Sequence, residues 1–156
     1  MELTEALKIM ENQKLMSMAT YGEKYPDNSV VCFAYAEDAK LYFGSYSDTL
    51  KCKNIQHNPV VAVTIGTLQV HGEARVIPYG TEEYWRKRKV YDARFPQYRE
   101  LFELEENELY EITPFVIWNY NPGKGGEMYR DCLILKEEYV RELDVYRPHD
   151  YLPRTK

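Results

Sequence analysis

The sequence has few cysteines, and their spacing excludes the common metal frameworks. Cys32, Cys52 and Cys132 are the only three, and neither a CxxC pair nor a Cys/His zinc spacing occurs. An odd number of widely separated thiols is typical of a reduced protein rather than of a disulfide scaffold. We therefore expect no metal site and a cytoplasmic location.

Long hydrophobic runs and an excess of positive charge are also missing. No stretch of 18 apolar residues occurs, and the first ten residues, MELTEALKIM, carry acids where a secretion signal would be basic. The formal net charge is −5 and the pI is about 5.3, which argues against general binding to nucleic acid or to an anionic membrane. Any anion site must then be a local cluster of donors.

What the chain does have is enough apolar material for one core. It is 156 residues long and 44% hydrophobic, which suits a single domain without disulfides or metals. Its 15 tyrosines fit half-buried strands, interfaces or ring-binding surfaces equally well. We expect one domain over residues 1–156, with a core at about 7–120 and a C-terminal extension at about 121–156.

Alternating and periodic apolar patterns predict the order of elements. An amphipathic helix is expected at 2–13, a helix at 82–91 and a short helix at 97–103. The RKRK run in the second of these is interpreted as an exposed helix face. Strands are expected at 15–21, 29–36, 40–45, 60–65, 69–77 and 109–120. Strand 29–36 is apolar on both faces, which favours the centre of a sheet, and Pro114 predicts a bulge or an edge position.

Six short, mostly antiparallel strands must close on themselves or pack as a sandwich to hide their edges. We favour the first solution, a mainly β protein built on a small six-stranded antiparallel barrel with helices around it. The glycine-rich stretch at 123–126 lacks the spacing of a phosphate loop and is interpreted as an ordinary loop.

The segment 41–65 is the strongest candidate for a site. A strand leads into a turn that contains Ser45, Ser47 and Thr49, followed by Lys51 and Lys53. Asp48 is expected to cap a short helix over 49–57, whose free N–H groups would point toward the same place. Hydroxyls, an ammonium group and a helix start together suit a phosphate, although an ordinary strand-turn-helix connection with solvated lysines would show the same pattern.

Four motifs in order resemble the pyridoxamine 5′-phosphate oxidase-like family of FMN-binding split barrels. They are LMSMAT at 15–20, PDNSVVCF at 26–33, LYFGSYSDTLKCKNIQHNPV at 41–60 and VHGEA at 70–74. Each motif is common by itself, but their order and spacing together are specific. The resemblance covers about residues 7–120 and implies a six-stranded split barrel that binds FMN.

The resemblance also implies which residues meet the cofactor. Gly44, Ser45, Ser47 and Lys51 would hold the FMN phosphate, with Lys53 as the second candidate lysine. The second strand would lay its backbone along the flavin ring, with these residues nearest: Ser29, Val30, Val31 and Cys32. The oxidase itself has an arginine where this chain has Ser29, so a second positive charge would have to come from elsewhere.

Family resemblance further implies a homodimer with the flavin between the subunits. Trp118 or Tyr120 would then reach the partner's flavin, or Trp118 would fill the barrel or the dimer core. Arg147 and His149 look like the oxidase's substrate-binding Arg-x-His. The tail from Lys136 to Lys156 has apolar anchors and is expected to pack on the surface or across the cleft.

Two classes of function remain open from the sequence. One is an FMN-dependent oxidoreductase that acts on a small molecule and takes electrons from NAD(P)H or another reductant, with no identifiable catalytic side chain. The other is a non-catalytic module that binds or senses flavin, or one that holds haem or a deazaflavin in the same cleft. His57 and His71 are interpreted as structural histidines.

Overall fold

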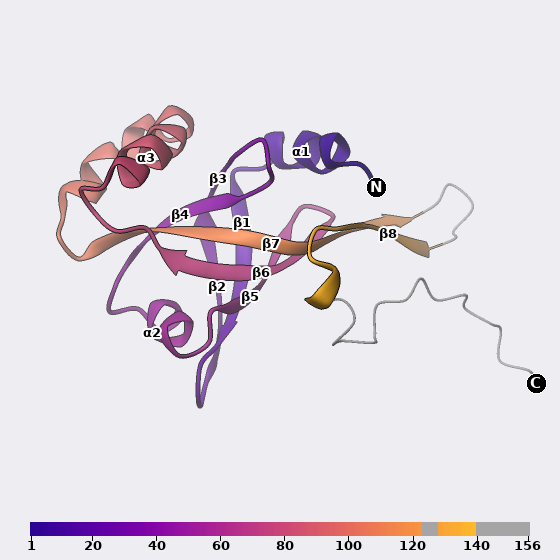
Figure 1. Cartoon of the computed structure of the whole chain (residues 1–156), viewed down its shortest axis with the longest axis horizontal. Coiled ribbons are helices and arrows are strands. Elements are labelled where there is room, and N and C mark those ends of the chain that lie inside the picture. The colour runs from indigo at the N-terminus through magenta and orange to yellow at the C-terminus, as the bar shows by residue number, and fades with distance from the viewer. Residues whose placement is uncertain (123–127, 140–156) are drawn as a thin grey trace, which may run out of the picture.

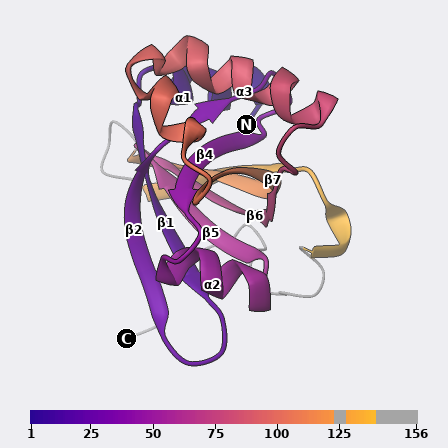
Figure 2. The same cartoon turned by 90° about the vertical axis from the view of Figure 1, so that its left-hand side faces the viewer.

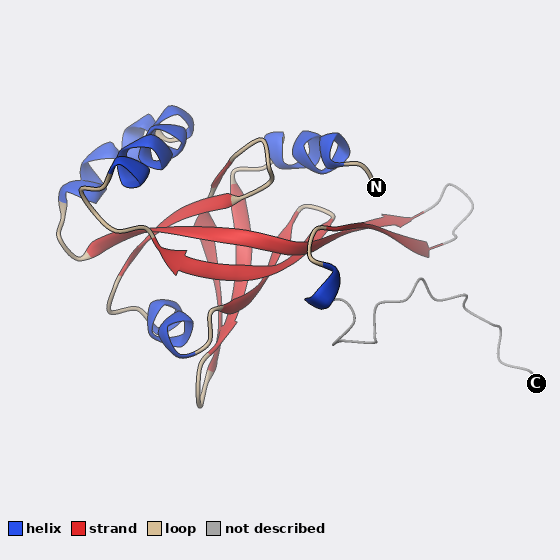
Figure 3. Ribbon diagram, viewed as in Figure 1, coloured by secondary structure: helices blue, strands red, loops and turns tan. Residues whose placement is uncertain are grey.

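The computed structural model describes residues 1–122 and 128–139. It contains one antiparallel sheet with helices around it (Figures 1 and 3). The helices are α1 (Leu3–Glu11), α2 (Leu50–His57), α3 (Glu82–Arg94) and the 3-10 helix η1 (Pro96–Glu103). The strands are β1 (Leu15–Tyr21), β2 (Pro26–Cys32), β3 (Ala34–Tyr35), β4 (Leu41–Tyr46), β5 (Val60–Ile65), β6 (Leu68–Val76), β7 (Asn107–Pro122) and β8 (Met128–Ile134).

The sheet is curled into a barrel that stays open along one line. Its strand order is β2-β1-β5-β6-β7-β4-β3, with β8 paired to the far end of β7. At one end of this order lies β2, and it also contacts β4, the second strand from the other end. The sheet therefore curls back on itself. In Figure 2, α1 and α3 lie on one side of the curled sheet and α2 lies on the opposite side. This is the split barrel that the motifs imply.

Alternating side chains fill the barrel. In β1 every second residue, beginning with Met16, is buried, and in β5 the same holds for Val61, Val63 and Ile65. A second cluster forms where α3 and η1 cover the β3–β4 end, around Tyr84, Tyr91 and Phe102. The strands expected at 15–21 and 60–65 have the predicted bounds.

The second strand differs from its prediction. Instead of one central strand over 29–36, the chain forms β2 at the edge of the sheet and, after Phe33, the two-residue β3. Val30 is 65% exposed, so the run is not buried on both faces. The apolar run 29–33 was expected to be buried by the rest of its own chain, but it lies in β2 and just after it, at the edge of the sheet, where one face is exposed.

Two further differences concern β7 and the segment after it. The bulge expected at Pro114 is present, as the β6–β7 register shifts between His71 and Gly72. The described residues contain eight strands rather than six, because β2 and β3 are separate and β8 was not predicted. The loop expected at 123–126, Arg147 and His149, and most of the C-terminal tail lie outside the described residues.

The four helices lie where they were predicted, but the surroundings of the α3 cations differ from the prediction. Lys87 and Arg88 of the RKRK run are buried rather than solvated. Lys87 pairs with Glu83 and Glu111, and Arg88 pairs with Asp92. Glu83 and Asp92 each lie four residues from their partner on α3, and Glu111 lies on β7. The RKRK run was interpreted as solvated because these carboxylates are not adjacent to it in the sequence.

In residues 1–122 and 128–139, no helix combines the length and apolar character needed to cross a bilayer.

Candidate functional site

The turn between β4 and α2 gathers the hydroxyls that the sequence singled out. Ser45 is buried, and its Oγ lies 3.2 Å from Oγ1 of Thr49. Thr49 Oγ1 donates to the carbonyl of Tyr46 at 2.9 Å, and Ser47 N–H donates to the carbonyl of Glu106 at the same distance. These bonds fix a tight turn, so the three hydroxyl residues are held in place by the backbone on either side.

Helix α2 starts one residue later than expected. Thr49, not Asp48, occupies the N-cap position, and its side chain makes no capping hydrogen bond. The hydroxyl is instead committed to the carbonyl of Tyr46. The start of α2 therefore has no side-chain cap to satisfy its first N–H groups, which leaves them available to an anion.

The two candidate lysines differ in their surroundings. Lys51, in the first turn of α2, is half-buried, whereas Lys53 is exposed. Neither has a carboxylate within ion-pair distance among the residues that the structure describes. Lys51 thus combines proximity to the hydroxyl turn with an unpaired charge, which makes it the better candidate for a phosphate.

Strand β2 lies beside this turn, as the resemblance implies. It contacts both α2 and β4, so the two halves of the expected site meet in one protomer. Its side chains alternate between the faces of the sheet, with Val31 packed against the core and Val30 pointing outward. Ser29 Oγ donates to Asp27 at 3.2 Å. A flat ligand along β2 would therefore meet backbone and only alternate side chains.

Cys32, at the end of β2, turns toward the α3–η1 side. It packs against the cluster there, and burial raises the pKa of its thiol, although a hydrogen bond with Tyr98 opposes this shift. A raised pKa keeps the thiol protonated and weakly nucleophilic at neutral pH. The residue therefore contributes contact surface rather than reactivity.

Gly44 and Trp118 are placed less directly. A Cβ on Gly44 would lie 2.5 Å from the ring of Phe102, so this glycine lets η1 pack onto β4.

Trp118 is buried on β7, ten residues beyond Glu108, which pairs with Ser45. At about 3.3 Å per residue, roughly 30 Å of strand separates them. Trp118 instead meets the ring of His71 edge-on, with 4.9 Å between centroids. One protomer does not bring Trp118 to the β4–α2 turn.

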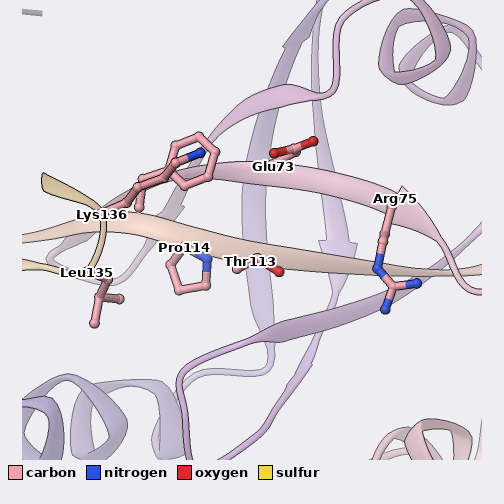
Figure 4. Close-up of a pocket in the computed structure, with 7 residues that line it drawn as sticks. Glu73, Arg75, Thr113, Pro114, Leu135 and Lys136 are labelled. Carbon is pink, nitrogen blue, oxygen red and sulfur yellow. The ribbon is translucent and has the colours of Figure 1, made fainter. Parts of the chain in front are cut away.

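The structure also contains cavities that the sequence did not indicate. One of about 390 Å³ lies over the β6–β7 bulge and is lined by Glu73, Arg75, Thr113, Pro114, Phe115, Leu135 and Lys136. Figure 4 shows Arg75 and Lys136 at its opposite ends, with Thr113 and Pro114 between them. A second, of about 340 Å³, lies between α3 and η1. No local motif could reveal either, because their walls come from distant segments.

Neither of these two cavities includes the β4–α2 turn. Among the described residues, no three His, Cys, Asp or Glu side chains are grouped so that they could hold a metal ion. The hydroxyls, helix start and lysine of the turn are instead the donor set expected for a phosphate group.

Comparison with known proteins identifies the family of the fold. A family model described as pyridoxamine 5′-phosphate oxidase matches residues 3–120. No curated protein sequence matches the chain.

Solved structures share the fold at low identity. General Stress Protein 26 from Bacillus anthracis is 20% identical, with a TM-score of 0.63 over 85% of this chain and 98% of the other. HutZ, the haem storage protein from Vibrio cholerae, is 17% identical, with a TM-score of 0.63 over 73% and 91%. A pyridoxamine 5′-phosphate oxidase-related, FMN-binding protein from Nostoc punctiforme is 16% identical, with a TM-score of 0.55 over 84% and 94%.

Proposed function

Because the chain belongs to the pyridoxamine 5′-phosphate oxidase family, we propose that it is an FMN-binding oxidoreductase of a small molecule that works as a homodimer. The observation that carries this proposal is the β4–α2 turn. The turn contains the buried Ser45, Ser47 with its N–H bonded to the carbonyl of Glu106, and Lys51, which has no ion-pair partner among the described residues. They lie at the start of α2, which has no side-chain cap. Hydroxyl, N–H and ammonium donors together match what a phosphate group needs.

Different residues would contact the two parts of the cofactor, the phosphate and the flavin ring. Ser47 would donate a hydrogen bond to the phosphate, and Ser45 would do so by turning its hydroxyl away from Thr49. Lys51 would supply a charge-assisted contact. The backbone of β2 would lie along the flavin ring, where N–H and C=O groups can pair with its polar edge. When bound, FMN supplies a hydride acceptor and donor at N5, with NAD(P)H as the proposed electron source.

A homodimer is supported by the surface that one protomer leaves uncovered. Val30 of the edge strand β2 is 65% exposed, and Leu15, on the same face of β1, is 53% exposed. A single open half-cleft cannot bury both faces of a tricyclic ring, but a second copy could close it. Tyr120 of that copy, which is 45% exposed, would then reach the flavin, whereas Trp118 is buried within its own protomer.

The Nostoc protein that shares this fold is described as FMN-binding, which supports the cofactor. HutZ is described as a haem storage protein, so haem in the same cleft is the second candidate, and a non-catalytic flavin module is the third. Three free thiols, Cys32, Cys52 and Cys132, fit the reducing cytoplasm that we propose as its location.

The absorption spectrum of the purified protein tests the cofactor first. Flavin bands near those of free FMN support the proposal, and a Soret band would replace FMN by haem. Oxidation of NADPH or NADH by the FMN-loaded protein then separates an enzyme from a binding module. Light scattering at micromolar concentration tests the assembly, and a monomeric FMN-loaded protein would contradict the shared cleft.

A further inference from the structure

Asn54 connects the two walls of the proposed cleft. It lies on α2 and is only 5% exposed. Its Nδ2 donates to the carbonyl of Tyr25 at 3.0 Å and to Oγ1 of Thr20 at 3.2 Å. Thr20 ends the buried face of β1, and Tyr25 directly precedes β2. One side-chain amide therefore ties α2 to the β1–β2 hairpin.

On the hairpin side, Gly22 packs directly against Asn54. A Cβ at that position would lie 2.7 Å from Oδ1 of Asn54 and 2.9 Å from its Cα. The second of these is a backbone atom, so a rotamer change of Asn54 could not relieve the clash. The hairpin and the helix are thus in direct contact, and any side chain at residue 22 would push them apart.

Helix α2 needs such a tether because it is short. Eight residues form few helical hydrogen bonds, so the position of α2 depends on its packing. Cys52 and Ile55 bury apolar surface in the core, but apolar contacts are not directional. Hydrogen bonds to two fixed acceptors define both the rotation of the helix and its position along the hairpin.

The tether lies close to the phosphate end of the site. Lys51 and Asn54 are three residues apart on α2, so they occupy neighbouring positions on the helix surface. The hairpin that Asn54 holds includes β2, the proposed wall for the flavin ring. The separation between the ring wall and the donors that α2 supplies, Lys51 and the helix start, therefore depends on this amide.

Building on the proposed function, we infer that Asn54 is a positioning residue that makes the site select a flavin mononucleotide over the unphosphorylated flavin. It need not touch the ligand. It fixes the distance between the ring wall and the phosphate donors of α2, so that a ligand with both a ring and a phosphate gains both sets of contacts at once. Loss of the tether should weaken the contacts to the phosphate far more than those to the ring.

The test compares dissociation constants for FMN and riboflavin, measured by quenching of flavin fluorescence. In Asn54→Ala we expect the FMN constant to rise roughly fivefold to tenfold, as part of a charge-assisted contact is lost. The riboflavin constant should change less than about twofold, so the preference for FMN falls. Gly22→Ala displaces α2 without altering any donor and should have the same effect.

Ile55→Ala is the matched control, because Ile55 is the next residue of α2 and is equally buried but takes no part in the tether. It should lower stability and leave the ratio of the two constants unchanged. Thr20→Val removes one acceptor and offers a milder variant should Asn54→Ala not fold. In a Lys51→Ala background, Asn54→Ala should cost less FMN affinity than in the wild type, because the two act on the same contact.

The outcomes separate this inference from the function on which it rests. A wild-type protein that binds neither flavin contradicts the proposed function and the inference with it. A wild type that prefers FMN, with the same preference retained in both Asn54→Ala and Gly22→Ala, contradicts the positioning role alone. Equal losses for FMN and riboflavin would mean that Asn54 is simply structural.

Discussion

Two helices of this protein carry groups of cations, and the two groups are held in opposite ways. On α3, Lys87 and Arg88 are buried and each of their charges meets a carboxylate. On α2, Lys51 is half-buried and meets none among the described residues. Charge neutralised within the fold serves stability, whereas charge left unpaired beside hydroxyls is available to a ligand.

The α3 group is a closed network beneath the helix. Arg75 of β6 holds Glu111 of β7 at 2.7 Å and also pairs with Glu83, while Lys87 bridges the same two acids. Glu111 is only 2% exposed. Burial, together with the charge of Glu111, raises the pKa of Tyr42 to about 12. The network joins α3 to the sheet, and its two cations are matched by its two acids.

The largest effect should come from opening this network. Glu111→Ala leaves Arg75 and Lys87 with one shared carboxylate, and breaking a buried pair costs about 3–5 kcal/mol. Denaturant unfolding should show this loss, while the FMN affinity of the folded protein stays within about twofold. The exposed Glu100→Ala is the control and should stay within about 0.5 kcal/mol. A loss of less than about 1 kcal/mol for Glu111→Ala would mean that the network is not a structural unit.

The reverse pattern is expected on α2. Lys51→Ala should leave stability within about 0.5 kcal/mol of the wild type, because no ion pair is lost. It should weaken FMN binding by about 1.5–3 kcal/mol, or roughly tenfold to a hundredfold. Fluorescence quenching measures this, with Lys53→Ala as the matched control and a change of less than about twofold expected there. Equal affinities of wild type and Lys51→Ala would remove the lysine from the site.

A smaller effect should appear with pH. Arg75 and Lys87 lower the pKa of Glu83 from 4.5 to about 2. The stabilisation from this carboxylate is therefore complete above pH 4.5 and is lost as the pH falls toward 2. Since a third of its side chain is exposed, the contribution is about 1 kcal/mol or less. Unfolding curves of wild type and Glu83→Gln should converge as the pH drops, and a constant gap from pH 6 to pH 3 would contradict the assignment.

Sequence alone predicted the parts of the fold whose signals are local. Strands 15–21 and 60–65 are short, mainly apolar runs that end at a turn glycine, Gly22 or Gly66, and Pro114 marks the bulge where it was expected. β8 was missed because MYRDCLI mixes polar and apolar residues without a clear period. The edge position of β2 was missed because an apolar sequence does not reveal whether its own chain or a partner will cover it.

The site shows the same division. The hydroxyl turn and Lys51 lie in one continuous segment, so their spacing is visible directly in the sequence. The role of Asn54 depends on Thr20, Gly22 and Tyr25, about 30 residues away, and only the fold brings them together. The buried state of Lys87 likewise depends on Glu111, on a strand that comes after the helix.

The register of β4 has a consequence for the order in which the protein folds. Residues 41–46 pair with residues 107–112, so the strand that carries Ser45 joins the sheet only after a long loop closes. The β1–β2 and β5–β6 hairpins close over short turns and can form much earlier. The phosphate donors should therefore reach their final geometry late, after most of the barrel has formed. A bound flavin would then slow unfolding while leaving the folding rate nearly unchanged.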